Sequence, residues 1–102
     1  LLYKLKVLNL KEFENLIKTP DFITALNLEI LILEDCIRLV DVHPSIGVLK
    51  RLKLLNLRGC RSPKNLHKFS EIDCKLENLL ERYLDDTGIK ELPFFNSTSQ
   101  KA

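Results

Sequence analysis

The sequence of 102 residues contains no methionine, not even at position 1, and only three glycines. Because a primary translation product starts with methionine, we expect the chain to be a piece of a longer protein. It contains no G-x-x-x-x-G-K-[ST] phosphate-binding loop, which excludes that route to nucleotide chemistry. No apolar run approaches the ~20 residues of a membrane-spanning helix, and the N-terminus lacks a signal-peptide pattern.

The sequence also lacks a large excess of charge of either sign. The net charge is +2, with basic and acidic residues interspersed, so we expect neither a nucleic-acid nor a membrane partner. The three cysteines form an odd number and have no metal-ligand spacing, which favours free thiols in a reducing compartment. We therefore expect a cytoplasmic location, with the nucleus as the alternative, although the sequon at Asn96 would suit a secreted protein.

What the sequence does contain is a repeated leucine pattern. Its clearest copy is L-x-x-L-x-L-x-x-C-x-x-L, which runs from Leu28 to Leu39. Four stretches share the spacing, and they begin at Leu5, Leu28, Leu52 and Leu79. The intervals of 23, 24 and 27 residues fall within the range of leucine-rich repeats. One such unit cannot bury its own apolar face, so the units must stack.

The pattern predicts an α/β leucine-rich-repeat solenoid, a short right-handed horseshoe arc. Parallel strands form its concave side, and irregular or short helical segments form its convex side. We expect about four units over residues 1–93, irregular at 61–78, and a polar tail at 94–102. Asp21 and Ser45 are expected to cap short helical turns on the convex side.

Three positions within the repeats carry more specific expectations. Cys36 and Cys60 recur at one position of the unit, where a small buried thiol would pack, and Phe13 takes that position in the first unit. Arg82 stands where other units have leucine, and we expect its side chain to reach solvent at the end of the array.

Strand residues that alternate with the inward leucines should form columns across the concave sheet. Two columns of alternating charge are interpreted as ladders of ion pairs that favour the register; they comprise Lys11, Glu34, Arg58 and Asp85, and Lys6, Glu29, Lys53 and Leu80. A third column is mostly apolar, and with its neighbour it predicts a partner-binding surface. The predicted partner-binding residues are Val7, Asn9, Ile30, Ile32, Leu54, Asn56 and Tyr83. The alternative is that such residues simply suit strands.

Catalysis is not expected, and we predict no catalytic, cofactor-binding or metal-binding residue. His43 and His67 lie in different units without metal-ligand spacing. The repeat position of the cysteines predicts burial rather than reactivity. Asp85 and Asp86 are adjacent, so on a strand they would face opposite ways, and we expect Asp86 in the turn that follows.

Several stretches of the sequence resemble the leucine-rich-repeat region of plant intracellular disease-resistance receptors. The branch is the one with a Toll/interleukin-receptor-type domain, a nucleotide-binding module and C-terminal leucine-rich repeats. The matching phrases lie at residues 5–10, 15–22, 27–36, 42–47, 55–60 and 87–93, and the resemblance covers roughly residues 4–93. The sequence departs from the family at Glu12–Glu14, at Arg82 and over residues 61–75.

The resemblance implies a recognition and regulatory segment of an immune receptor. Such repeats bind a pathogen effector or a guarded host protein, and they restrain the receptor's own nucleotide-binding module. The residues themselves support only a protein-binding scaffold. Two alternatives are the substrate-recruiting arm of a ubiquitin-ligase adaptor, which an upstream F-box would reveal, and an extracellular receptor, which paired capping cysteines would reveal.

Overall fold

The computed structural model describes residues 2–61 and 76–87 of the chain. Most of the stretch predicted to be irregular at 61–78 lies outside these residues. His67 and the tail predicted at 94–102 lie entirely outside them.

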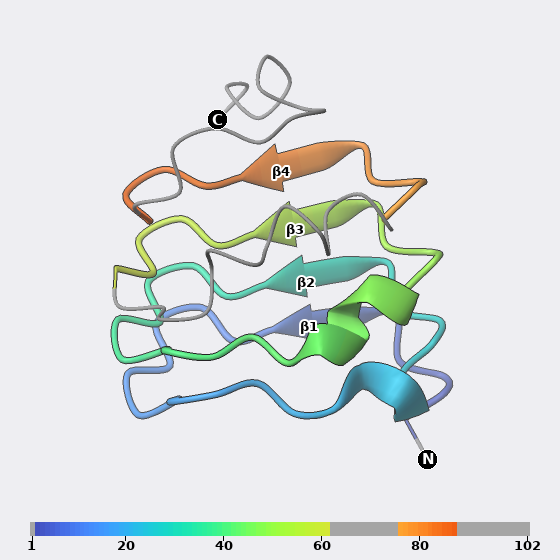
Figure 1. Cartoon of the computed structure of the whole chain (residues 1–102), viewed down its shortest axis with the longest axis horizontal. Helices are drawn as coiled ribbons and strands as arrows, with labels where there is room; N and C mark the ends of the chain where they lie inside the picture. The colour runs from blue at the N-terminus through green and yellow to red at the C-terminus, as the bar shows by residue number, and fades with distance from the viewer. Residues whose placement is uncertain (1, 62–75, 88–102) are drawn as a thin grey trace.

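The described chain forms a four-stranded parallel sheet in which the strands follow one another in sequence order. Figure 1 shows the strands side by side, all pointing the same way, with two short 3-10 helices on one side of the sheet. The bounds are β1 Val7–Asn9, η1 Phe22–Thr24, β2 Ile30–Ile32, η2 Pro44–Val48, β3 Leu54–Asn56 and β4 Glu81–Tyr83. A parallel α/β arrangement compatible with leucine-rich repeats was predicted, and the sheet confirms it at this level.

The leucines of the repeat form the core because their spacing places one side of every strand inward. Leu8, Leu31 and Leu55 are in register across β1, β2 and β3. In the second and third units the inward leucines are fully buried, whereas Leu5, Leu8, Leu10 and Leu16 of the first unit are only partly buried. The difference follows from stacking, because within the described residues the first unit has a neighbour on one side only.

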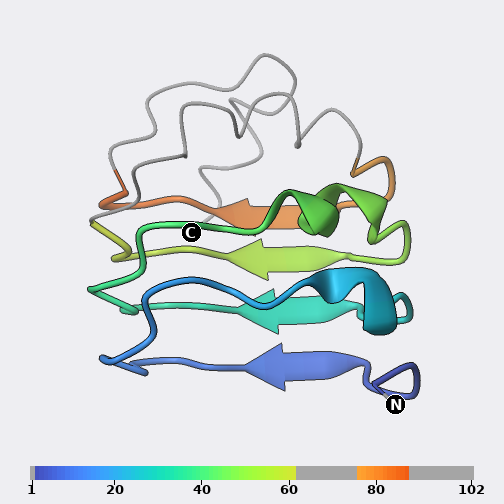
Figure 2. The same ribbon diagram turned by 60° about the horizontal axis from the view of Figure 1, so that its bottom comes forward.

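The return segments pack against each other on one side of the sheet, and Figure 2 shows η1 and η2 there, in front of the strands. Asp21 caps η1 by accepting a hydrogen bond from the Ile23 N–H, as predicted. Buried Thr19 joins the two units, because its N–H donates to Asp41 O at 3.0 Å and its hydroxyl accepts from the His43 N–H at 2.7 Å.

The predicted cap at Ser45 is wrong. The N-cap of η2 is His43, whose Nδ1 accepts from the Ser45 N–H at 3.0 Å. The Ser45 hydroxyl instead accepts from the Phe22 N–H of the preceding unit at 2.6 Å. The helix begins one residue before Ser45 because Pro44 suits its first position, which needs no N–H donor.

Each strand leads into a tight turn that keeps the sheet hydrogen bonding for several more residues. The N–H of Glu12, Asp35 and Gly59 each donates to a carbonyl of the next unit at 2.8 Å. These residues and Asp86 have positive φ, so each unit carries one left-handed residue at the same place. Asp86 therefore lies in the turn, as predicted. At Gly59 a Cβ atom would lie 2.1 Å from Asp35 Oδ1, so a larger residue there would displace the Asp35 side chain.

Two expectations about inward positions are wrong. Arg82 is only 2% exposed, because it is in register with Leu55 in the column that faces the core. Its guanidinium does not reach open solvent, and the residue interacts with a neighbouring group. Phe13 is 51% exposed, unlike fully buried Cys36 and Cys60; it belongs to the first unit, whose leucines are also only partly buried.

Candidate functional site

The outward side of the sheet carries the residues predicted to bind a partner, and the strands align them as expected. Val7 pairs with Ile30, Ile30 with Leu54, and Leu54 with Glu81. The adjacent column runs through the remaining predicted residues, which are Asn9, Ile32, Asn56 and Tyr83. The alignment is dictated by burial, because a shift of one residue would expose the leucines opposite them.

Exposure differs along this surface. Val7 is 50% exposed on the edge strand, whereas Ile30 and Leu54 are half-buried on central strands, flanked by neighbours on both sides. These three residues are called the apolar strip below. Asn9 is exposed, and Ile32 and Tyr83 are half-buried beside the strip.

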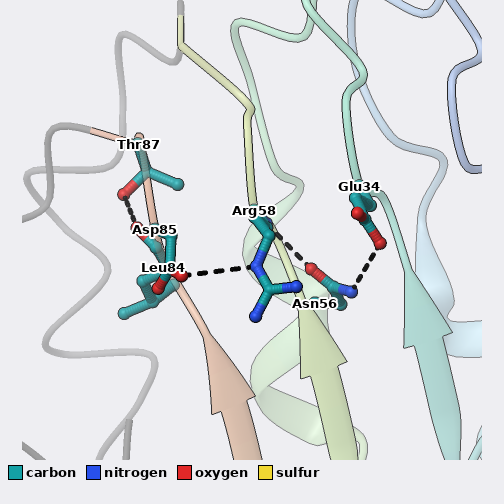
Figure 3. A network of polar contacts seen from close by, with 6 residues as sticks. All are labelled: Glu34, Asn56, Arg58, Leu84, Asp85 and Thr87. Carbon is teal, nitrogen blue, oxygen red and sulfur yellow. Dashed lines mark hydrogen bonds and ion pairs between the residues drawn. The ribbon is translucent and has the colours of Figure 1, made fainter. Parts of the chain in front are cut away.

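Asn56 was predicted to contact a partner, but it is only 9% exposed. Its side-chain polar atoms form hydrogen bonds within the sheet. Its Nδ2 donates to Glu34 Oε1 at 3.1 Å, and its Oδ1 accepts from the Arg58 N–H at 2.9 Å. Figure 3 shows this chain of contacts from Glu34 through Asn56 to Arg58. Asn56 therefore organises the surface more than it offers atoms to a partner, since a satisfied buried amide has little left to donate.

The same network continues to β4 through the Arg58 side chain. Arg58 Nε lies 3.4 Å from Asp85 Oδ2 (Figure 3), and the guanidinium carbon lies 5.1 Å from the centre of the Tyr83 ring. The Tyr83 hydroxyl donates to Glu81 Oε1. This hydrogen bond to a carboxylate raises the pKa of Tyr83, so the phenol stays protonated as a donor. Sequence columns alone miss this cluster, because Arg58 and Tyr83 lie on a diagonal.

The charge ladders are formed only in part. Arg58 pairs with Asp85 at 3.4 Å, and Lys53 pairs with Glu29 at 4.0 Å. Across residues 2–61 and 76–87, no ion pair joins Lys11 to Glu34 or Lys6 to Glu29. Glu34 accepts from Asn56 instead, so hydrogen bonding replaces charge pairing at the centre of that column.

The two thiols of the described region are buried and bonded to backbone. Cys36 Sγ donates to Leu10 O at 3.1 Å, and Cys60 Sγ donates to Leu33 O at 2.9 Å. Burial raises the pKa of Cys36, and it raises the pKa of Cys60 to about 11. A nucleophile needs the opposite shift and access to substrate, so these groups serve packing, as their repeat position predicts.

Asp21, His43 and Ser45 have the residue types of a hydrolase triad but a different arrangement. In a triad the carboxylate orients the histidine, and the histidine activates a free hydroxyl. Here the pKa of Asp21 is lowered chiefly by a hydrogen bond from the Ile23 N–H, with a smaller effect of a hydrogen bond from Ser45. The His43 Nδ1 accepts from the Ser45 N–H and so caps η2. The Ser45 hydroxyl joins the two return segments, because it interacts with Asp21 and accepts from the Phe22 N–H.

Residues 2–61 and 76–87 hold no group of three His, Cys, Asp or Glu side chains placed to bind a metal ion. No helix in these ranges is long and apolar enough to cross a membrane.

No protein-family model matches the chain. The chain is 36% identical over 89 residues to the disease resistance protein RRS1 of Arabidopsis thaliana, covering 87% of the chain and 6% of that protein. It is 31% identical over 108 aligned positions to the TMV resistance protein N of Nicotiana glutinosa, covering 87% and 9%. It is 33% identical over 113 positions to the disease resistance protein RML1A of Arabidopsis thaliana, covering 91% and 11%. The chain thus spans only a small fraction of the length of these relatives.

Proposed function

The chain belongs to the leucine-rich-repeat region of plant disease-resistance proteins, and on this premise we propose that its outward sheet face recognises another protein. The partner is a pathogen-derived or guarded host protein, and in the resting receptor it is the receptor's own nucleotide-binding module. The described units form part of a longer right-handed solenoid, with this sheet on its concave side. The segment itself carries no catalytic step and acts in the cytoplasm, with the nucleus as the alternative.

The observation that carries the proposal is the apolar strip. Val7, Ile30 and Leu54 lie side by side across three strands and point away from the leucine core. Half of the Val7 surface is exposed. An aligned apolar strip among polar and charged side chains is typical of a contact surface.

Two further observations favour an immune receptor over the alternatives. The relatives named above are disease-resistance proteins rather than ubiquitin-ligase adaptors or extracellular receptors. Cys36 and Cys60 are free rather than paired, as proteins of a reducing compartment require.

The test is a triple change of the apolar strip, Val7→Ser, Ile30→Ser and Leu54→Ser, in the full-length receptor. The exposed and half-buried strip should tolerate the change at modest cost, because its side chains lie outside the core. We expect cell death to be lost in the presence of elicitor, or to occur without it, at unchanged protein level. Cell death in leaf tissue and immunoblotting of the receptor measure the two quantities.

A control changes three apolar residues of a return segment whose exposure is similar to that of Val7 and greater than that of Ile30 and Leu54. Ile17, Ile23 and Leu26 are 56%, 58% and 46% exposed, and their change to Ser should leave signalling as in wild type. Normal signalling by the strip variant, with and without elicitor, would refute the proposal. The strip would then consist of ordinary strand-forming residues.

A further inference from the structure

The partner's chemistry can be inferred from Arg58, which lies at the end of the outward sheet face. We propose that the Arg58 guanidinium binds an Asp or Glu carboxylate of the protein partner, next to an apolar side chain that contacts Ile32 beside the strip. This inference rests on the proposed function, because it names what the partner presents to the same face.

Arg58 is held in place before any partner arrives. Its N–H donates to Asn56 Oδ1 at 2.9 Å, its Nε lies 3.4 Å from Asp85 Oδ2, and its guanidinium carbon lies 5.1 Å from the Tyr83 ring centre. A stacked guanidinium with one ion pair has lost much of its rotamer freedom, so a ligand does not have to supply that ordering.

The atoms that would bind the ligand remain available. In the described residues, the contacts of the Arg58 side chain run through Nε and through the face of the guanidinium, which leaves the two terminal nitrogens for a ligand. The side chain is 34% exposed, so these nitrogens are accessible. Terminal guanidinium nitrogens match the two oxygens of a carboxylate, and such bonds are among the strongest in proteins.

The surroundings favour a carboxylate over a phosphate. Glu34, Glu81 and Asp85 lie on the same part of the sheet and are neighbours of Arg58, Asn56 or Tyr83. Their negative charges oppose a doubly charged phosphate more strongly than a singly charged carboxylate. Of the two anions, a single carboxylate is therefore the one that these charges oppose less.

The position of Ile32 determines which kind of side chain the partner places next to that acidic residue. Ile32 is in register with Asn56, two residues before Arg58. With strands about 4.8 Å apart and about 3.3 Å of rise per residue, the backbones of Ile32 and Arg58 lie about 8 Å apart. A partner segment with an acidic residue one or two positions from an apolar residue can reach both.

The experiment is selection of a random-peptide library displayed on phage against the purified full chain. Wild type should enrich peptides that carry an acidic residue next to an apolar one. Arg58→Ala should weaken the best of them about tenfold, the effect expected for one charge-assisted bidentate contact. Arg58→Lys should weaken them several-fold, because lysine keeps the charge but lacks the planar fork.

Asp85→Asn separates ligand binding from a merely structural role. Because Asp85 helps to hold Arg58 in place, its removal should weaken the peptides less than Arg58→Ala does, whereas a purely structural role of the Arg58–Asp85 ion pair would make the two losses equal. Arg38→Ala changes an exposed arginine elsewhere and should have no effect. Protection of Cys36 and Cys60 from a thiol reagent verifies that each variant is folded, because both thiols are buried.

The outcomes distinguish this inference from the proposed function. Peptides that depend on the apolar strip but keep their affinity in Arg58→Ala would overturn the carboxylate contact and leave the protein-binding face in place. Selected peptides whose affinity depends neither on the apolar strip nor on Arg58 would overturn both the carboxylate contact and the proposed protein-binding face. Enrichment of phosphate-mimicking sequences with several adjacent acids, or of no peptide at all, would also overturn the carboxylate contact.

Discussion

Leu31→Asp is expected to unfold the described repeats. Leu31 is fully buried at the centre of β2, in register with Leu8 on one side and Leu55 on the other. A carboxylate there would be desolvated between two stacked units, at a cost of roughly 4 kcal/mol or more. That is a large part of the total stability of an ordinary domain.

Thiol labelling measures this loss directly. Cys36 and Cys60 are buried, and the pKa of Cys60 is raised to about 11, so native protein should react slowly at pH 8. In Leu31→Asp both thiols should react at the rate of an unfolded chain. Cys74 lies outside the described residues and is replaced by serine so that two reporters remain.

Ile30→Asp is the matched control for that experiment. It introduces the same charge one residue away, on a half-buried side chain that points outward. It should keep both cysteines protected. Fast labelling of both thiols in the unmutated protein would contradict the alternation of inward and outward residues on which the sheet depends.

Phe22→Ala is the second large effect, with an expected loss of about 3–5 kcal/mol, the range for removing a buried phenyl ring. Phe22 is 1% exposed in η1 and belongs to the core cluster, although it comes from a return segment rather than a strand. Its N–H also donates to Ser45 Oγ of the next unit. The ring therefore anchors the side of the repeats that the leucine pattern does not describe.

Urea denaturation measures the effect of Phe22→Ala. The urea concentration at the unfolding midpoint should fall, while the slope of the unfolding free energy against urea concentration stays constant. This combination indicates a change of stability rather than of compactness. Ile23→Ala is the control, because Ile23 is the next residue and is 58% exposed; its change should stay within about 0.5 kcal/mol. Equal midpoints for the two variants would mean that the Phe22 ring does not pack in the core.

The strands and their register could be predicted because the same physical demand recurs in every unit. Leu8, Leu31 and Leu55 must face inward, and a period of two then fixes which neighbours face outward. The columns of Val7 and of Asn9 followed from that alternation alone. The parallel sheet and the buried thiols depend on the same repeated spacing.

Features formed between units could not be predicted in this way. The choice of His43 over Ser45 as the cap depends on the Phe22 N–H, which comes from another return segment. Asn56 is buried because Glu34 and Arg58 surround it from two units. Arg82 has a leucine's position and a charge, and only the packing around it decides that it stays inside.

The partner-binding role of the sheet face is tested most directly by photo-crosslinking in the full-length receptor. A photoreactive amino acid replaces Val7 on the sheet face in one variant and Ile23 on the opposite side in the other. Both positions are exposed, at 50% and 58%, so they have comparable access to neighbours. We predict crosslinks from position 7 to another protein or to the nucleotide-binding module, changing on elicitation, and few from position 23. No crosslink from position 7, or equal products from both positions, would contradict the proposed role.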